Sequence, residues 1–301
     1  MLSVSCLTSS LNVKKMASGI YNVATWVWHK VLRRPVKLNV AYDNHAKHVK
    51  LTVVFLHGIS ATSDTWRSTF KQIESDSELK NVRLIALDLL GFGKSLKADW
   101  LKYNEEEYLD ALNRSLKKVR HSGPIVLIGH SMGSLIAADY VVDYNNPADI
   151  EELILVSPPL LMADELAKLP DQVYTKSYGS LHKFASEVPA AEVIAKLVQK
   201  FSSFRSDYIK GVAFERSMDN IILNRKNYQT FIKIRLPTLI IHGHFDPLVM
   251  GSNLRRAAKH NPHYLKYISV IGHHDISVGK RAKIILKLKK ILKEGQKNEA
   301  I

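Results

Sequence analysis

Short runs of hydrophobic residues, rich in Val, Ile and Leu, recur at intervals along the chain. Most of them are apolar at nearly every position instead of alternating with polar residues. This pattern is typical of strands that are covered on both faces, as in a parallel sheet. The six strands that it predicts are residues 51–56, 82–87, 125–128, 153–156, 238–241 and 265–271.

Between these runs, apolar residues repeat at the spacing of an amphipathic helix. The pattern predicts helices over residues 105–119, 132–144 and 281–292, and in the last of these Ile284 and Leu288 lie on one face. Strands that alternate with helices form crossover units. The predicted fold class is therefore α/β, with a doubly wound, mostly parallel sheet.

One segment interrupts this alternation. Residues 160–235 contain no strong strand pattern, whereas residues 190–201 and 214–223 have helical patterns. This is typical of a helical cap inserted into a core. We therefore predict a core formed by residues 46–159 and 236–301, with residues 160–235 as the cap.

The first 45 residues form a separate basic and apolar segment. No Asp or Glu occurs in residues 1–42, and Lys and Arg flank an apolar stretch, residues 17–28, that is too short to span a bilayer and lacks a signal-peptide cleavage site. Three interpretations stay open: an amphipathic helix on anionic lipid, a transit peptide, or a helix packed on the domain. A start at Met16 is open as well. Four residues at helical spacing favour the first and third interpretations: Val23, Trp26, Val27 and Val31.

Composition and charge narrow the choice of partners and compartment. A chain of 301 residues with 46% hydrophobic residues can bury a substantial core, and its 43 Lys and Arg against 28 Asp and Glu give a net charge of +15. The basic residues are scattered and lack a nucleic-acid-binding motif, so we expect no nucleic-acid partner. The single cysteine, Cys6, cannot form an intrachain disulfide and suits a reducing compartment. We expect a cytoplasmic protein, with peripheral contact with an anionic membrane left open by residues 1–45.

The strongest chemical signal is the G-x-S-x-G sequence at residues 129–133. Gly129-His130-Ser131-Met132-Gly133 follows a predicted buried strand and begins a predicted helix. A serine on so sharp a turn needs small neighbours, because strand and helix approach closely there. The amino-terminal amides of the helix would stabilise negative charge that develops near the serine.

Four motifs in this order resemble the α/β-hydrolase family, and the resemblance covers residues 50–292. They are His57-Gly58 after the first core strand, residues 88–95 after the next, the Ser131 turn, and the acid and base of a triad. The resemblance implies a serine hydrolase of the AB hydrolase-1 type with a helical cap. In that family, the residues after the His-Gly pair and after the nucleophile donate backbone amides to the oxyanion hole, which implies Ile59 and Met132 here.

A serine hydroxyl is a poor nucleophile at neutral pH, so a histidine must take its proton and a carboxylate must orient that histidine. The family's chain order is serine, acid, histidine. Asp246 follows a predicted strand and is the expected acid, while Asp164 and Asp275 are weaker candidates.

For the base, the last predicted strand is followed by Gly272-His273-His274. The family's Gly-His pair maps onto residues 272–273 and favours His273, with His274 as the alternative. Adjacent side chains in an extended loop point in different directions, so we expect only one of them to reach Ser131. His57 and His130 are interpreted as structural.

The expected activity is cleavage of a carboxylic ester or similar acyl substrate through an acyl-enzyme, with no cofactor and no metal. A carbon-carbon bond hydrolase, a cofactor-free haloperoxidase and an acyltransferase would use the same triad, so these alternatives stay open. A binding module without catalysis is an alternative from another class. The run His242-x-His244-x-Asp246 resembles a zinc ligand set only superficially, because Pro247 stands where that motif carries a further histidine.

Aromatic residues in the predicted cap suggest an apolar acyl or aryl substrate. Most of them are expected to form the core of the cap itself, and the rest to line a pocket. The seven candidates are Tyr174, Tyr178, Phe184, Phe201, Phe204, Tyr208 and Phe214.

Overall fold

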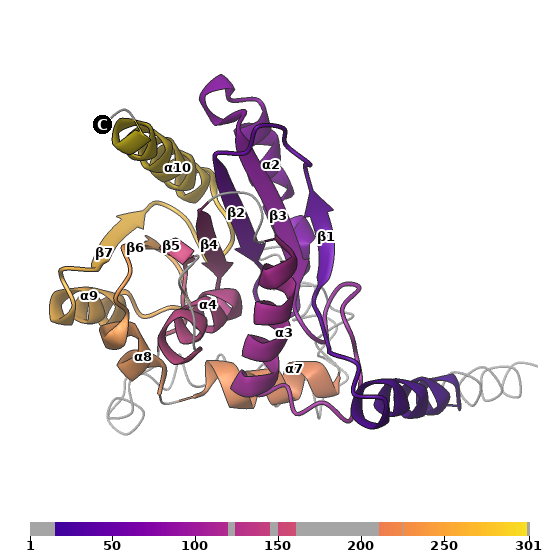
Figure 1. Cartoon of the computed structure of the whole chain (residues 1–301). Helices are drawn as coiled ribbons and strands as arrows, with labels where there is room; N and C mark the ends of the chain where they lie inside the picture. Colours follow the sequence, from indigo (N-terminus) through magenta and orange to yellow (C-terminus); the bar gives the residue numbers. More distant parts are fainter. Residues whose placement is uncertain (1–15, 120–123, 145–149, 161–210, 225, 300–301) are drawn as a thin grey trace, which may run out of the picture.

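A seven-stranded sheet forms the centre of the molecule (Figure 1). The computed structural model describes residues 16–119, 124–144, 150–160, 211–224 and 226–299. The strand order is β1-β3-β2-β4-β5-β6-β7, and all neighbours pair in parallel except β1 and β3. The strands are β1 (Asn39–Asp43), β2 (Leu51–Leu56), β3 (Val82–Asp88), β4 (Ile125–His130), β5 (Ile150–Val156), β6 (Thr238–Gly243) and β7 (Leu265–Val270).

The six predicted strands are confirmed as β2 to β7, whereas β1 was not predicted. This strand lies at the edge of the sheet and pairs antiparallel with β3. Its residues are only partly buried or exposed, so it lacks the continuous apolar run of the inner strands. The Arg83 guanidinium lies 2.6 Å from the Asp43 carboxylate and ties the end of β1 to β3.

Helices cover both faces of the sheet, and each face has its own hydrophobic cluster. The smaller cluster packs α2 and α10 against one face, and the larger one packs α3, α4, α8 and α9 against the other (Figure 1). This arrangement confirms the doubly wound sheet. Besides the N-terminal helix over residues 16–26, the helices are α2 (Arg67–Glu74), α3 (Glu105–Val119), α4 (Met132–Asp143), α7 (Val212–Ser217), α8 (Asn227–Lys233), α9 (Gly251–His260) and α10 (Val278–Glu299), with short 3-10 or π segments η1 (Val27–Val31), η2 (Ser63–Trp66), η3 (Ser77–Leu79) and η6 (Met218–Ile222).

Most of the predicted cap lies outside the described residues, including the predicted helix at 190–201. The described part is helical: α7 and η6 confirm the helix predicted at 214–223. Phe214 is fully buried in the larger cluster, as expected of a residue that forms core instead of a pocket wall. The boundaries of the cap stay a prediction.

Three carboxylates from α3 and α4 come together. Oxygen atoms of Glu105, Asp139 and Asp143 lie within 4.8 Å of one another, and Asp139 is buried. Burial and, after it, the negative charge of Glu105 raise the pKa of Asp139 to about 8, while a hydrogen bond with Thr230 opposes both effects. At neutral pH, this carboxyl is therefore largely protonated.

The raised pKa of Asp139 makes the stability of the fold depend on pH. The pKa of Asp139 in the folded state lies above the unfolded value. The contribution of this carboxyl to the free energy of unfolding is therefore fully present below about pH 4 and is lost as pH rises through about 8. We expect the Tm of the wild type to fall between pH 6 and pH 9 relative to that of Asp139→Asn, measured by differential scanning calorimetry. A Tm difference between the two proteins that stays constant with pH would contradict the buried, protonated state of Asp139.

Candidate active site

Ser131 occupies the turn between β4 and α4, as the G-x-S-x-G pattern predicts. Its backbone has φ 51° and ψ −119°, a strained conformation for a residue with a side chain. Hydrogen bonds hold it on both sides: the Ser131 amide donates to the Val156 carbonyl at 2.9 Å, and the Ser131 carbonyl accepts from the Ser134 amide at 2.9 Å. The serine is thus fixed between β5 and the first turn of α4.

The two glycines of the motif are required by close backbone contacts. A Cβ atom on Gly129 would lie 2.4 Å from the Gly133 carbonyl oxygen, and one on Gly133 would lie 2.6 Å from the His57 carbonyl oxygen. Because backbone atoms supply these contacts, the neighbours cannot turn aside as a flexible side chain could. Glycine at both positions therefore lets strand, helix and the His57 loop meet around the serine.

The predicted oxyanion-hole residues lie on the two segments next to Ser131. A Cβ atom on Gly58 would lie 3.0 Å from the Ser131 Cβ atom, so the loop that leads to Ile59 passes beside the serine. Met132 begins α4, where backbone amides are free of intrahelical acceptors. Both residues are buried.

Asp246 follows β6, and its carboxylate contacts His274. The Nδ1 atom of His274 lies 3.1 and 3.0 Å from the two carboxylate oxygens, and both side chains are buried. Burial alone would raise the pKa of Asp246, but the charge and hydrogen bond of His274 and the charge of Lys280 outweigh burial and hold it well below its usual range. Asp246 is therefore ionised and positioned to orient the imidazole.

The structure corrects the expectation that His273 is the partner of Asp246. The His273 ring lies outside the buried pair, with its Nδ1 atom 3.2 Å from the Phe245 carbonyl oxygen. Consecutive side chains in this extended loop point to opposite sides, and the side directed inward belongs to His274. The Gly-His motif gives the position of the loop but does not fix which histidine turns toward the carboxylate.

The other sequence candidates lie elsewhere. His242, in the zinc-like run, contacts the Tyr267 hydroxyl, His244 is exposed, and Asp246 contacts His274, so the run does not gather as a ligand set. Asp164 falls outside the described residues. Asp275 follows His274, and its backbone carbonyl accepts a hydrogen bond from Lys280.

His57 and His130 make the structural contacts expected of them. The Leu89 amide donates to His57 Nε2 at 2.9 Å, and His57 Nδ1 donates to the Gly58 carbonyl at 2.7 Å. Burial lowers the pKa of His57 to about 4, so it is neutral. His130 Nε2 lies 2.8 Å from the His274 carbonyl oxygen, and the rings of these two histidines lie 5.0 Å apart. His130 therefore links the strand before Ser131 to the histidine loop.

A buried lysine that the sequence did not single out holds this loop. The Lys280 ammonium group donates to the carbonyls of His273, His274 and Asp275 at 2.6, 3.1 and 2.8 Å and to the Ser157 hydroxyl at 2.7 Å. Burial lowers the pKa of Lys280 to about 8, against the opposing effect of nearby carboxylates. In the sequence, Lys280 is hidden among the many lysines of α10.

The chain is similar in sequence to known proteins. A protein-family model described as "Serine aminopeptidase, S33" matches residues 47–276. "Probable lysophospholipase BODYGUARD 1" of Arabidopsis thaliana is 36% identical over 117 residues, which are 39% of this chain and 24% of that protein. "Monoacylglycerol lipase ABHD6" of Homo sapiens is 22% identical over 271 residues, which are 80% of this chain and 77% of that protein. The chain spans about a quarter of the length of the BODYGUARD relatives that it matches.

Solved structures share the fold. A bromoperoxidase from Bacillus anthracis superposes with a TM-score of 0.62 at 19% identity, covering 88% of this chain and 98% of that one. An esterase from Exiguobacterium antarcticum gives a TM-score of 0.60 at 18% identity, covering 86% and 100%. These likenesses show the α/β-hydrolase fold that the sequence motifs implied.

The position of Lys280 predicts a stability effect. Lys280→Met leaves several buried acceptors without their donor, which we expect to lower the free energy of unfolding by about 2 kcal/mol, or Tm by roughly 6 °C. Lys283→Met, at an exposed position of the same helix, is the matched control and should change Tm little. Equal Tm values for the two variants would show that the histidine loop does not depend on Lys280.

Proposed function

Because the chain belongs to the serine aminopeptidase, S33 family of α/β-fold serine hydrolases, we propose that it cleaves a carboxylic ester or similar acyl substrate through Ser131, His274 and Asp246. The observation that carries this proposal is the buried contact of His274 with Asp246, at the same edge of the sheet as the strained Ser131 turn. An ionised carboxylate that orients an imidazole beside an activated serine is the arrangement that acyl transfer requires.

The proposed mechanism assigns one role to each group. Ser131 attacks the acyl carbon while His274 takes the hydroxyl proton, and Asp246 stabilises the imidazolium that results. The backbone amides of Ile59 and Met132 bind the oxyanion of the tetrahedral intermediate. His274 then gives its proton to the leaving group, and a water that it deprotonates releases the acid from the acyl-enzyme.

The proposed substrate is a small acyl lipid or another apolar ester. The support comes from the names of the relatives, a lysophospholipase and a monoacylglycerol lipase. Of the seven aromatic candidates of the predicted cap, all except Phe214 lie outside the described residues, and Phe214 is part of the hydrophobic core.

Acyl transfer to an alcohol is a second candidate, because one relative favours it. "Probable 1-acylglycerol-3-phosphate O-acyltransferase" of Oryza sativa subsp. japonica is 31% identical over 111 residues, which are 36% of this chain and 25% of that protein. Both reactions share the acyl-enzyme and differ in the acceptor. Incubation of the protein with a monoacyl ester and a lysolipid acceptor, followed by mass spectrometry, separates free acid from a diacyl product.

Ser131→Ala should lose covalent labelling by a fluorophosphonate probe and lower turnover of a p-nitrophenyl ester by roughly 10⁴-fold or more. The reason is that the variant lacks the hydroxyl that would form the acyl-enzyme. Circular dichroism checks that the variant is folded. Hydrolysis at the wild-type rate by this variant would refute the assignment of Ser131 as the nucleophile. A wild-type protein that binds esters but is not labelled by the fluorophosphonate probe would be a binding module.

The two adjacent histidines allow a matched comparison. His274→Ala should lower kcat by roughly 10³-fold or more, because the base and its contact with Asp246 are lost together. His273→Ala removes an exposed ring from the same loop and should keep kcat within a few-fold of the wild type. A larger loss of kcat in His273→Ala than in His274→Ala would assign the role of the base to His273.

A further inference from the structure

The helix at the start of the described chain is attached to the domain by its polar side. It runs from residue 16 through η1 and lies beside the segment around residue 100 (Figure 1). The Asn22 side chain bonds to the Asp99 carboxylate at 2.8 Å and accepts from the Asp99 amide at 2.7 Å, and the Trp100 indole donates to the Thr25 hydroxyl at 3.0 Å. The stripe in contact with the domain is therefore hydrophilic.

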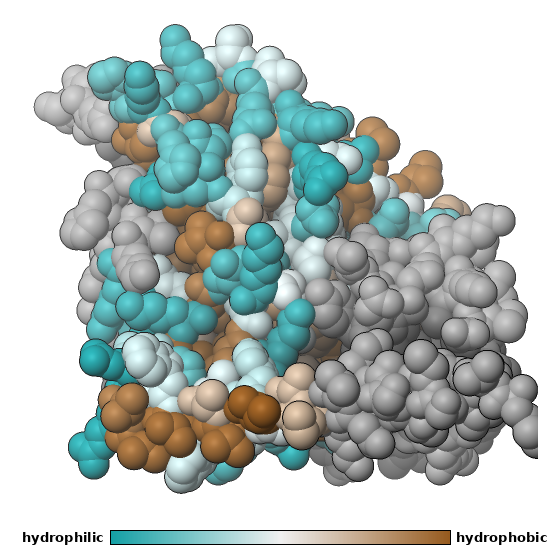
Figure 2. Space-filling view, turned by 90° about the vertical axis from the view of Figure 1, so that its right-hand side faces the viewer, coloured by the Kyte–Doolittle hydropathy of each residue, from teal (hydrophilic) through white to brown (hydrophobic). Residues whose placement is uncertain are grey.

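The opposite stripe is apolar and exposed. Met16, Ile20, Val23, Val27 and Val31 recur at intervals of three or four residues, and their exposed fractions are 66%, 62%, 64%, 38% and 55%. A helix on the surface of a globular domain normally buries such a stripe against the core. Here the apolar stripe faces away from the domain instead, and hydrophobic side chains gather along the lower edge of the molecule (Figure 2). Two tryptophans on the same helix, Trp26 and Trp28, are 47% and 53% exposed.

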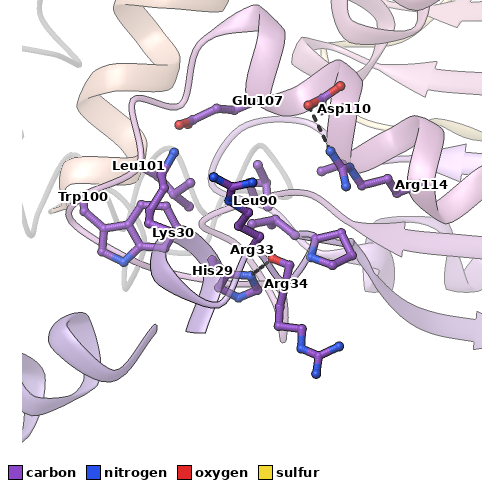
Figure 3. Close-up of a pocket in the computed structure, with 13 residues that line it drawn as sticks. His29, Lys30, Arg33, Arg34, Leu90, Trp100, Leu101, Glu107, Asp110 and Arg114 are labelled. Carbon is purple, nitrogen blue, oxygen red and sulfur yellow. Dashed lines mark hydrogen bonds and ion pairs between the residues drawn. The ribbon is translucent and has the colours of Figure 1, made fainter. Parts of the chain in front are cut away.

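Basic groups gather at the carboxyl end of this helix. His29, Lys30, Arg33 and Arg34 line a cavity of about 280 Å³ together with Arg114 of α3 (Figure 3). Its acidic lining residues already have partners, because Asp110 pairs with Arg114 at 3.4 Å and Glu107 accepts from the Tyr103 amide at 2.9 Å. The other walls are Trp100, Leu90, Leu101, Pro35, Val36 and Ala111.

We propose that this helix docks on the surface of an anionic phospholipid membrane. The apolar stripe enters the boundary between headgroups and acyl chains, the exposed tryptophans lie at the headgroup level, and the cations of residues 30–34 contact lipid phosphates. Charge complementarity favours an anionic membrane as the partner of this helix. A second copy of the chain would place one basic helix against another, in a protein that already carries a net charge of +15.

The docking surface is separate from the proposed catalytic residues, so its test does not depend on hydrolysis. None of the described helices is long and apolar enough to cross a membrane. A single interfacial helix with a basic patch gives reversible, salt-sensitive binding. The full chain should therefore co-sediment with vesicles of phosphatidylcholine and phosphatidylglycerol, bind phosphatidylcholine vesicles weakly, and dissociate as NaCl rises from ~0.1 M to ~0.5 M.

Two variants with the same change of charge test the apolar stripe. Ile20→Asp should lower the partition coefficient into anionic vesicles at least about tenfold. Leu286→Asp alters a side chain with the same 62% exposure on α10, also a basic helix, and should leave it nearly unchanged. Because both side chains are exposed, both variants should keep the wild-type Tm. Equal losses of binding would overturn the proposal and indicate attraction of the whole protein by charge.

A second pair of variants tests the cations. Arg33→Gln and Arg34→Gln should each lower the partition coefficient about fivefold, in line with the contribution of a basic residue near an anionic surface. Sedimentation velocity without lipid tests the alternative, in which a second copy of the chain covers the apolar stripe. A wild-type dimer that Ile20→Asp dissociates, with no binding to anionic vesicles, would assign the stripe to a second copy and overturn the membrane proposal.

Discussion

The strained backbone of Ser131 is the constraint on which the rest of the site depends. A residue with a side chain at φ 51° is stable only where its surroundings fix it. Here β4, β5 and α4 do so, because glycine at positions 129 and 133 lets backbone approach backbone. The parallel sheet then brings the proposed partners to the edge that carries the serine, since β2, β4, β5, β6 and β7 run in the same direction. The site is thus a consequence of strand direction as well as of residue identity.

Two buried carboxylates show how partners decide the charge state. Asp139 and Asp246 are both largely buried, yet the pKa of the first is raised and that of the second is lowered. Asp139 has other carboxylates as neighbours, so burial prevails. Asp246 faces His274 and lies near Lys280, whose positive charge survives burial because oxygen atoms surround the ammonium group. The lysine therefore has two effects: it holds the histidine loop through its carbonyls, and it adds to the effect of His274 in lowering the pKa of Asp246.

The sequence predicted the inner sheet and the serine turn because both depend on local patterns. Continuous apolar runs mark strands covered on both faces, and G-x-S-x-G between a strand and a helix has a steric reason. It did not predict β1, whose partly exposed residues carry no such run. It favoured His273 over His274, because the direction of a loop side chain depends on three-dimensional contacts that a motif does not show, such as those of the Lys280 ammonium group with the carbonyls of both histidines.

The N-terminal helix shows a further limit of pattern reading. Its apolar stripe is visible in the sequence, but periodicity alone does not tell whether such a stripe faces a core or the outside. Tertiary contacts decide this: the amide of Asn22 and the hydroxyl of Thr25 bind the segment at Asp99 and Trp100. Directional hydrogen bonds fix the rotation of this helix, although burial of its apolar stripe against the domain would favour the opposite rotation. The same polar contacts that attach the helix to the domain thereby turn its apolar residues outward, where a lipid surface can bury them.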